Sequence, residues 1–300
     1  MRKTKIELMD VLIHIGFIIG CCTFVFPMMM VVAASFSEEE RLLQEGIGIL
    51  PRGFTLQAYQ SAFTNMERMI RAYGVTIFHA VVGTVSSTLV AAMIAYPLSR
   101  TNFKYRKVLT WFVLFTMLLS PSMIPRYIVY SKYYHISNTM WMYILPGITG
   151  GAWNTLVLRT FFRSIPESLY EVAHIDGAKE MTIFARIALP LSKPAFASVG
   201  FLSMVAKWND YTTSMVYIRD EEFYTLQYLL QRLNAELTFL KSLSINMTEM
   251  GNITLDDLSN LPAETLKFAM CVIAAGPMLV AFPFFQKYFE KGLTIGAVKG

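Results

Sequence analysis

Charged residues are scarce in this chain, and so are cysteine and histidine. Only 16% of the 300 residues are charged, whereas 54% are hydrophobic, and the mean hydropathy is positive. A soluble domain usually carries about 25% charged residues. This shortage of charge excludes an ordinary soluble enzyme and a disordered chain, and it indicates an integral membrane protein.

The motifs of nucleotide and metal chemistry are also missing. No Gly-x-x-x-x-Gly-Lys-Ser/Thr sequence occurs, so the chain is not expected to bind ATP itself. The four histidines have no ligand-like spacing, and the three cysteines fall inside apolar runs. We therefore expect no catalytic residue, no metal and no cofactor in this chain, and the free energy for any transport must come from another chain.

Long apolar runs are what the sequence has instead. About 20 apolar residues cross a bilayer core of about 30 Å as a helix. Six runs come near or pass this length, and they predict an all-α, polytopic membrane protein with six transmembrane helices. The runs cover about residues 11–34, 73–98, 108–130, 139–161, 194–216 and 264–285.

Two of these runs carry residues that interrupt helices. Pro121 and Pro125 remove backbone donors from the third run and should break or kink it. The fourth run contains Gly147 and Gly151, a spacing typical of close helix packing in lipid. We therefore expect a bent third span and a thin, bent fourth span.

The basic residues define an orientation. Residues 99–107 hold four cations and no acid, which is typical of a cytoplasmic loop. Fifteen of the 26 lysines and arginines fall in segments that this assignment places inside, and eight fall in outer segments. The sequence therefore predicts two cytoplasmic termini. Because the net charge of +5 follows from this distribution, it does not indicate a nucleic-acid partner.

The loop between the fourth and fifth spans, residues 162–193, reads as two helices separated by a glycine turn. Ser164 stands three residues before Glu167, which predicts a capping box at the helix start. Gly177 can adopt the left-handed conformation that ends a helix. A second helical run then follows and is expected to end at Pro190.

Helical spacing divides the first of these helices into two faces, one apolar and one polar. Leu169, Val172 and Ala173 share the first face, and Glu167, Glu171 and His174 share the second. His174 on this polar face is expected to be solvated, with a contact to another protein as the alternative.

The spacing closely resembles the EAA loop of permease subunits in ABC importers. That pattern is Glu-Ala-Ala, three residues, Gly, nine residues, Ile, then Leu-Pro, and Val172 is the one departure from it. The resemblance implies that residues 162–193 form a cytoplasmic coupling loop that docks into a cleft on an ATPase subunit. The expected coupling residues are Glu171, Val172, Ala173, His174, Asp176, Gly177, Ala178, Ile187 and Pro190.

The likeness extends beyond the coupling loop to the carbohydrate-importer permeases, and more narrowly to the maltose-type second permease subunit and its relatives in polysaccharide transporters of Gram-positive bacteria. It is carried by Phe162, Arg163, Pro166, Asp176 to Ala178, Pro194, Trp208, Asn209 and the ending from 283 to 300. It implies the transmembrane domain of a type I ABC importer in a bacterial cell membrane.

The resemblance also implies a set of partners and a division of the chain. The partners are a homologous second permease, two ABC ATPase subunits that bind ATP and Mg, and an extracellular sugar-binding lipoprotein, all within membrane lipid. We expect residues 1–72 to hold the first span and an outer segment, 73–287 the core transmembrane domain, and 288–300 a cytoplasmic tail. Residues 244–260 are the candidate contact with the binding protein.

Polar residues inside the spans are the candidates for a substrate pathway, since such residues are costly in lipid. They are Arg126, Tyr127, Lys207, Trp208, Asn209 and Asp210. The aromatic rings would stack on sugar rings, and the two cations would favour an anionic or uronic sugar. The structural alternatives are that the cations snorkel, that Trp208 anchors at the interface, and that Asn209 joins two helices.

Three other functions remain open from the sequence. A secondary transporter working alone would usually show internal repeats or buried carboxylates for coupling ions, and Asp210 is the one acid near a span interior. A membrane scaffold would not bind an ATPase. An ABC importer for a solute other than sugar would share the coupling loop.

Overall fold

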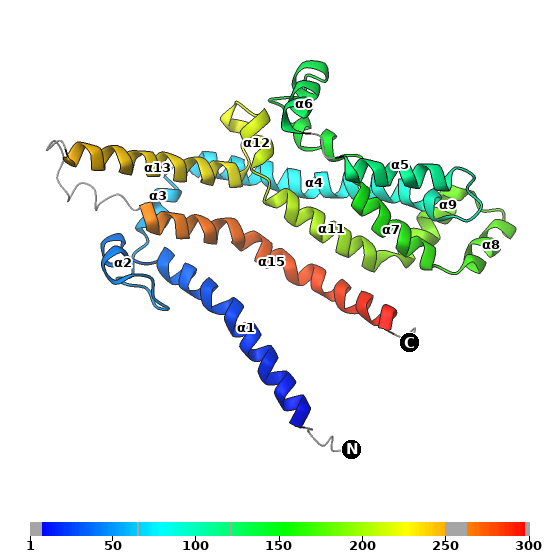
Figure 1. The fold of residues 1–300 in the computed structure, drawn as a ribbon, viewed down its shortest axis with the longest axis horizontal. Coiled ribbons are helices and arrows are strands. Elements are labelled where there is room, and N and C mark those ends of the chain that lie inside the picture. Colours follow the sequence, from blue (N-terminus) through cyan, green and yellow to red (C-terminus); the bar gives the residue numbers. More distant parts are fainter. Residues whose placement is uncertain (1–7, 65, 120–121, 250–262, 298–300) are drawn as a thin grey trace. The chain divides into compact units, whose positions relative to one another are not determined.

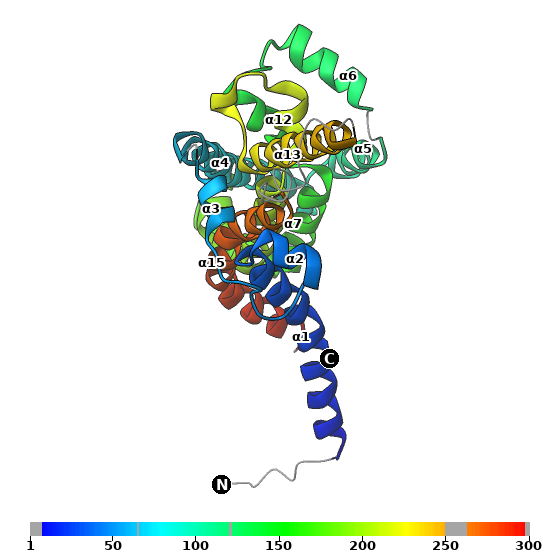
Figure 2. The same cartoon turned by 90° about the vertical axis from the view of Figure 1, so that its left-hand side faces the viewer.

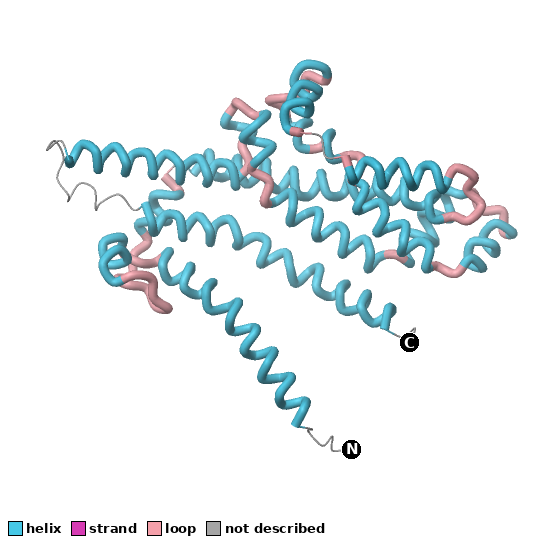
Figure 3. The backbone as a smooth tube through the Cα atoms, viewed as in Figure 1, coloured by secondary structure: helices cyan, strands magenta, loops and turns pink. Residues whose placement is uncertain are grey.

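The computed structural model describes residues 8–64, 66–119, 122–249 and 263–297. These residues form helices joined by loops, and no strand occurs among them apart from one isolated bridge between Ser37 and Phe54 (Figure 3). The expected all-α class is confirmed.

The helices differ widely in length (Figure 1). The α-helices are α1 (Leu8–Ser35), α2 (Glu39–Glu45), α3 (Gln57–Ala62), α4 (Met66–Ser99), α5 (Arg106–Leu118), α6 (Met123–Ile128), α7 (Ala152–Ser164), α8 (Glu167–Ile175), α9 (Glu180–Ile183), α10 (Leu189–Leu191), α11 (Lys193–Trp208), α12 (Thr212–Tyr217), α13 (Leu226–Glu249) and α15 (Ala263–Ala297). The 3₁₀ and π turns are η1 (Val129–Tyr133), η2 (Met140–Tyr143), η3 (Leu145–Gly147), η4 (Phe184–Ala188) and η5 (Glu221–Phe223).

Three helices of the described residues are long and apolar enough to cross a membrane, namely Val11–Ser35 in α1, α4, and Ala263–Gln286 in α15. The number rises to five if each of two bent helix pairs is one span. The expected six spans are therefore not confirmed as a count.

The expected third and fourth spans are interrupted. α5 ends at Leu118 and α6 begins at Met123, so the third run is two helices rather than one. In the fourth run, η2 and η3 precede α7, which begins only after Gly151. Gly150 and Gly151 both have positive φ, at 74° and 71°, which no helix accommodates.

The chain divides into two units, of which the first comprises residues 1–66 and 230–277. Within it, the buried Glu39 carboxylate of α2 accepts hydrogen bonds from the backbone N–H groups of Glu264 and Thr265 at 2.9 and 2.8 Å. The Thr265 hydroxyl donates a third, at 2.8 Å. These are the first amides of α15, which a carboxylate stabilises through hydrogen bonds and the helix dipole.

The second unit comprises residues 67–229 and 278–300. Its core, at the end of α4 that Figure 1 shows beside α8 and α9, is built by small α4 residues and aromatic rings from the neighbouring helices. The buried members from α4, α7, α8 and η4 include Ala91, Ala92, Ala95, Tyr96, Phe162, Tyr170 and Phe184.

At the other end of this unit, α6 lies beside α12 in both views (Figures 1 and 2). A cluster rich in tyrosine joins these two helices, since the rings of Tyr127 in α6 and Tyr217 in α12 stack with centroids 5.8 Å apart. The second unit thus contains two separate clusters of buried apolar and aromatic residues.

Candidate functional site

The helix α8 ends as the sequence predicts. Gly177 has φ of 77°, its N–H donates to the carbonyl of His174 at 3.0 Å, and the N–H of Ala178 donates to that of Ala173 at 2.9 Å. These two bonds form the Schellman motif, which satisfies the last carbonyls of a helix and favours glycine. The predicted stop at Gly177 is confirmed.

The start of α8 differs from the prediction. The helix begins at Glu167 after Pro166, and no side chain caps it. Ser164 is the last residue of α7, and its hydroxyl donates to the carbonyl of Phe161 at 2.7 Å. The expected capping box is wrong, because Ser164 bonds to the helix it ends.

The face of α8 that carries Leu169, Val172 and Ala173 is only partly buried. Tyr170 and Ala173 are the buried residues of the helix. Leu169 and Val172 are 44% and 57% exposed, and Ile175 is 85% exposed. Exposed large apolar residues on one helix are typical of a surface that contacts another protein or the membrane.

Arg100 holds α8 against the end of α4 through an ion pair and a cation–π contact. Arg100 Nη2 lies 3.1 Å from Glu167 Oε1, and its guanidinium lies over the Tyr170 ring, 3.8 Å from the centroid. Burial raises the pKa of the Tyr170 phenol, and the Arg100 charge opposes part of this shift. The Arg100 side chain is only 11% exposed, so it is largely buried between α8 and α4 and is not a solvated loop cation.

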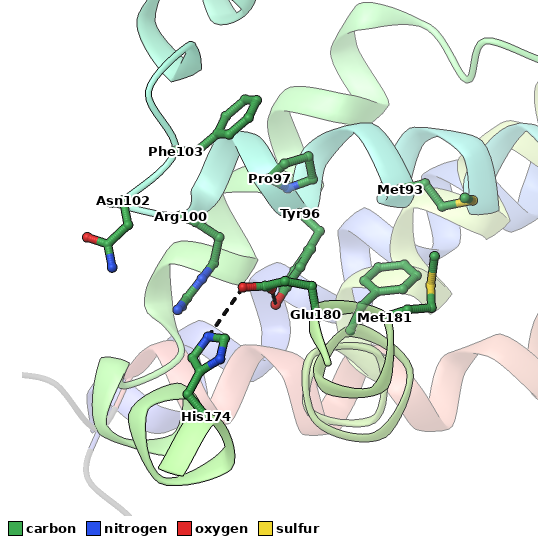
Figure 4. A pocket seen from close by; sticks show the side chains of 10 residues that line it. Met93, Tyr96, Pro97, Arg100, Asn102, Phe103, His174, Glu180 and Met181 are labelled. Atoms are coloured by element: carbon green, nitrogen blue, oxygen red, sulfur yellow. Dashed lines mark hydrogen bonds and ion pairs between the residues drawn. The ribbon is translucent and has the colours of Figure 1, made fainter. Parts of the chain in front are cut away.

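Glu180, at the start of α9, also links α8 to α4. Its carboxylate accepts a hydrogen bond from the Tyr96 hydroxyl at 2.7 Å and lies 3.3 Å from His174 Nε2. Figure 4 shows the three side chains converging beside a cavity of about 380 Å³, whose lining they share with Arg100 and Met181. His174 also remains 43% exposed, in agreement with the expected solvated histidine, while lying beside Glu180 of its own chain.

The second half of the coupling loop ends at Leu191, one residue after the expected Pro190. α9 passes through the π-helical turn η4 into α10, which contains Pro190, and a bend of 79° leads into α11. Ala178 and Ile187 pack against the core of the second unit, whereas Glu171, Asp176 and Pro190 are exposed. The predicted coupling residues thus divide into a packed set and an exposed set.

A second candidate site is a cavity of about 580 Å³, here called the polar cavity. It lies between α4, the turns before α7, and the end of α11. Lys207, Asn209 and Asp210, three of the predicted pathway residues, line it. The other lining residues include His79, Ser87, Tyr143, Gly147, Asn154 and Ser203.

Lys207 extends along two glycines. A Cβ placed on Gly83 would lie 3.1 Å from Lys207 Cδ, and a Cβ placed on Gly147 would lie 3.1 Å from its Nζ. The glycines therefore leave room for the lysine side chain between α4 and η3. Among the described residues, no carboxylate lies within ion-pair distance of Nζ.

Asp210 has partners of its own. One carboxylate oxygen accepts the backbone N–H of Thr213 at 3.1 Å, and the other accepts the Thr213 hydroxyl. The second oxygen also lies 3.5 Å from Nε2 of the buried His79. Asp210 thus ties the start of α12 to α4.

The remaining predicted pathway residues lie elsewhere. Trp208 is buried, at 3% exposure, and does not line the polar cavity. Arg126 and Tyr127 belong to α6, where Tyr127 packs on the tyrosine cluster. Asn209 donates to the carbonyl of Val205 in its own helix at 2.9 Å, so it does not join two helices through this bond.

Sequence reasoning missed several residues of the polar cavity. His79 was noted without a role, and Asn154, whose amide donates to the Ser203 hydroxyl at 3.0 Å, was not singled out. Their signal was a polar side chain within an apolar run. The predicted glycine seam is also displaced, because Gly150 makes the close approach: a Cβ there would lie 2.4 Å from the Ser87 carbonyl oxygen.

Comparison with known proteins covers both sites. Residues 87–295 match the family model described as "Binding-protein-dependent transport system inner membrane component". The chain belongs to this family. The expected resemblance to ABC importer permeases is confirmed, and so is the all-α membrane domain of a type I importer.

Relatives and a solved structure match this permease over nearly its whole length. The polygalacturonan/rhamnogalacturonan transport system permease protein of Bacillus subtilis is 36% identical, covering 99% of this chain and all of the relative. The arabinooligosaccharides transport system permease protein of Halalkalibacterium halodurans is 29% identical over both full lengths. A crystal structure of a bacterial ABC transporter involved in the import of the acidic polysaccharide alginate contains a chain 26% identical to this permease. The TM-score is 0.76, with 96% of this permease and 99% of that chain covered.

Proposed function

We propose that this permease is one of two homologous transmembrane subunits of an ATP-driven importer of oligosaccharides. The observation that carries the proposal is the exposed face of α8, where Val172 and Ile175 lie beside Glu171 and all three are exposed. Such a face suits insertion into a cleft of another protein. The names of the relatives, which concern saccharide transport, support the choice of cargo.

The partner of α8 in this proposal is an ATPase subunit. Two such subunits bind ATP and Mg, and their closure moves the α8 helices of the two permeases. Tyr170 and Ala173 pack in the core beside α4, and Arg100 pairs with Glu167 of α8. Because of these contacts, α8 moves with α4 rather than alone. Force applied to the coupling loop thereby reaches the transmembrane helices.

The orientation follows from the same proposal. Both termini and the coupling loop lie in the cytoplasm, in agreement with the excess of basic residues in those segments. An extracellular sugar-binding lipoprotein delivers the cargo at the opposite side, where residues 244–260 are its candidate contact. Residues 250–260 of that segment lie outside the described residues.

The polar cavity is the part of the permease that we assign to the pathway. Its amides, hydroxyls and single ammonium offer hydrogen bonds that match sugar hydroxyls. Arg126 and Tyr127, on α6 beside the tyrosine cluster, remain candidates for an outer part of the pathway. Trp208 supports the end of α11 from its buried position.

The test is the variant Glu171→Ala in the complex purified with its partners. We expect weaker retention of the ATPase subunits and slower ATP-driven oligosaccharide uptake, with unchanged insertion of the permease in the membrane. Glu222→Ala serves as the matched control, because Glu222 is an exposed glutamate of η5, outside the coupling loop.

Three outcomes would contradict the proposal. Unchanged ATPase retention and uptake in Glu171→Ala would remove the coupling role of this face. Uptake that survives ATP depletion while an ion gradient is kept would indicate a secondary transporter. Purification without any ATPase, under conditions that keep the two permeases together, would indicate a scaffold.

A further inference from the structure

Lys207 is the ammonium that the polar cavity presents to its contents. Its stem lies against Gly83 and its Nζ reaches Gly147, so the charged end lies at the wall of the polar cavity. The side chain is half-buried. A cation in this position is costly unless an anion or several acceptors face it.

The chain itself offers Lys207 little compensation. Asp210 attracts it at a distance, but the Asp210 carboxylate is already bonded to Thr213 and adjacent to His79. Among the described residues, no other carboxylate lines the polar cavity. The ammonium is therefore left to pair with a charge that arrives with the cargo.

The other polar groups around Lys207 are neutral. Asn154, Ser203 and Asn209 present amides and a hydroxyl to the same space. A sugar unit that carries one carboxylate and several hydroxyls matches this set, with one cation for the carboxylate and neutral groups for the hydroxyls. A neutral oligosaccharide would leave the ammonium without an anionic partner.

We propose that Lys207 is a specificity-determining residue that pairs with the carboxylate of an acidic, uronate-containing oligosaccharide in the polar cavity. This inference rests on the proposed function and adds the charge of the cargo. The family as a whole does not fix that charge, because the relatives are named for both acidic polymers and for arabino- and galacto-oligosaccharides. The preference for an acidic cargo is therefore inferred from Lys207 and not from the family.

The experiment compares two substrates with the same sugar chain, trigalacturonate and its methyl ester, in which methyl groups remove the carboxylate charges. Uptake of each is measured in proteoliposomes that contain the complete complex with its binding protein and ATP. The ratio of the two rates in each variant is divided by the wild-type ratio, which cancels the preference of the binding protein. We expect Lys207→Met to lower uptake of trigalacturonate by about 10- to 100-fold, the worth of a charge-assisted pair, with less than about twofold change for the ester.

Two further variants make the result specific. Lys207→Arg keeps the charge and should keep most of the preference for the acid. Lys193→Met removes a lysine from the first turn of the same helix, α11, where it is exposed outside the polar cavity. It should change both rates together or not at all.

The inference is overturned if Lys207→Met slows both substrates equally, which would indicate a structural charge partner for Asp210. It is also overturned if the wild-type complex imports the ester and excludes the acid, although the proposed function would then survive. A wild-type complex that imports no oligosaccharide with ATP present would overturn both.

Discussion

Arg100 gives the sharpest test of how α8 is held to the transmembrane helices. We predict that Arg100→Met loosens α8, because it removes the pair with Glu167 and the contact with the Tyr170 ring. The matched control is Lys104→Met, which removes an exposed cation from the same loop.

The magnitude follows from the burial of the two contacts. Glu167 is 43% exposed, so its pair with Arg100 is worth about 1 kcal/mol after screening by solvent. The cation over the largely buried ring adds about 1 kcal/mol. Arg100→Met should thus lower the free energy of unfolding by about 2 kcal/mol, and Lys104→Met should change it by less than about 0.5 kcal/mol.

Two assays read this effect. Thermal unfolding of the detergent-solubilised complex reports the stability, and the amount of sugar imported per ATP hydrolysed reports the coupling. We expect Arg100→Met to lower both, since a loosened α8 transmits less of the ATPase movement to α4. A double-mutant cycle with Glu167→Gln should show an interaction energy of about 1 kcal/mol. Stability and coupling both equal to those of Lys104→Met would refute the reasoning.

Two further predictions concern packing away from α8. Gly150→Ala should destabilise the permease by about 2 kcal/mol more than Gly151→Ala, because both glycines have positive φ but the new Cβ at Gly150 would also overlap α4; equal thermal shifts would contradict this. Glu39→Ala should lower the free energy of unfolding by about 2 kcal/mol, because it leaves the first amides of α15 without their carboxylate, and the exposed Glu40→Ala is the control. A comparable melting temperature for the two glutamate variants would count against the capping role.

The sequence was sufficient wherever a local rule decides the structure. The stop of α8 at Gly177 follows from the conformation that glycine allows. The third run was expected to break at proline, and it forms the separate helices α5 and α6, between which Pro121 lies outside the described residues. The match to the coupling loop depended on spacing alone and placed the chain in its family.

The sequence was insufficient wherever a distant residue decides. Tyr170, and not Leu169 or Val172, is buried in α8, because its ring meets Tyr96 and Arg100 some 70 residues earlier in the chain. Hydrophobicity cannot show this, since an apolar residue serves equally at a protein core, a lipid face and a docking surface.

The polar cavity shows the same limit. Lys207 and Asp210 were found as polar residues in an apolar run, but their different fates depend on Gly83, Gly147 and His79, which belong to other elements. Only the fold reveals that Asp210 is occupied and that Lys207 is available.

The central claim is that the exposed face of α8 lies in the cytoplasm against an ATPase. The accessibility of a cysteine that replaces Ile175 tests this claim most directly. The native Cys21, Cys22 and Cys271 are first replaced, so that any labelling comes from the introduced cysteine. The account predicts that a membrane-impermeant thiol reagent labels Ile175→Cys in inside-out vesicles, not in intact cells, and that bound ATPase subunits protect it. Labelling of this position from outside intact cells would contradict the account.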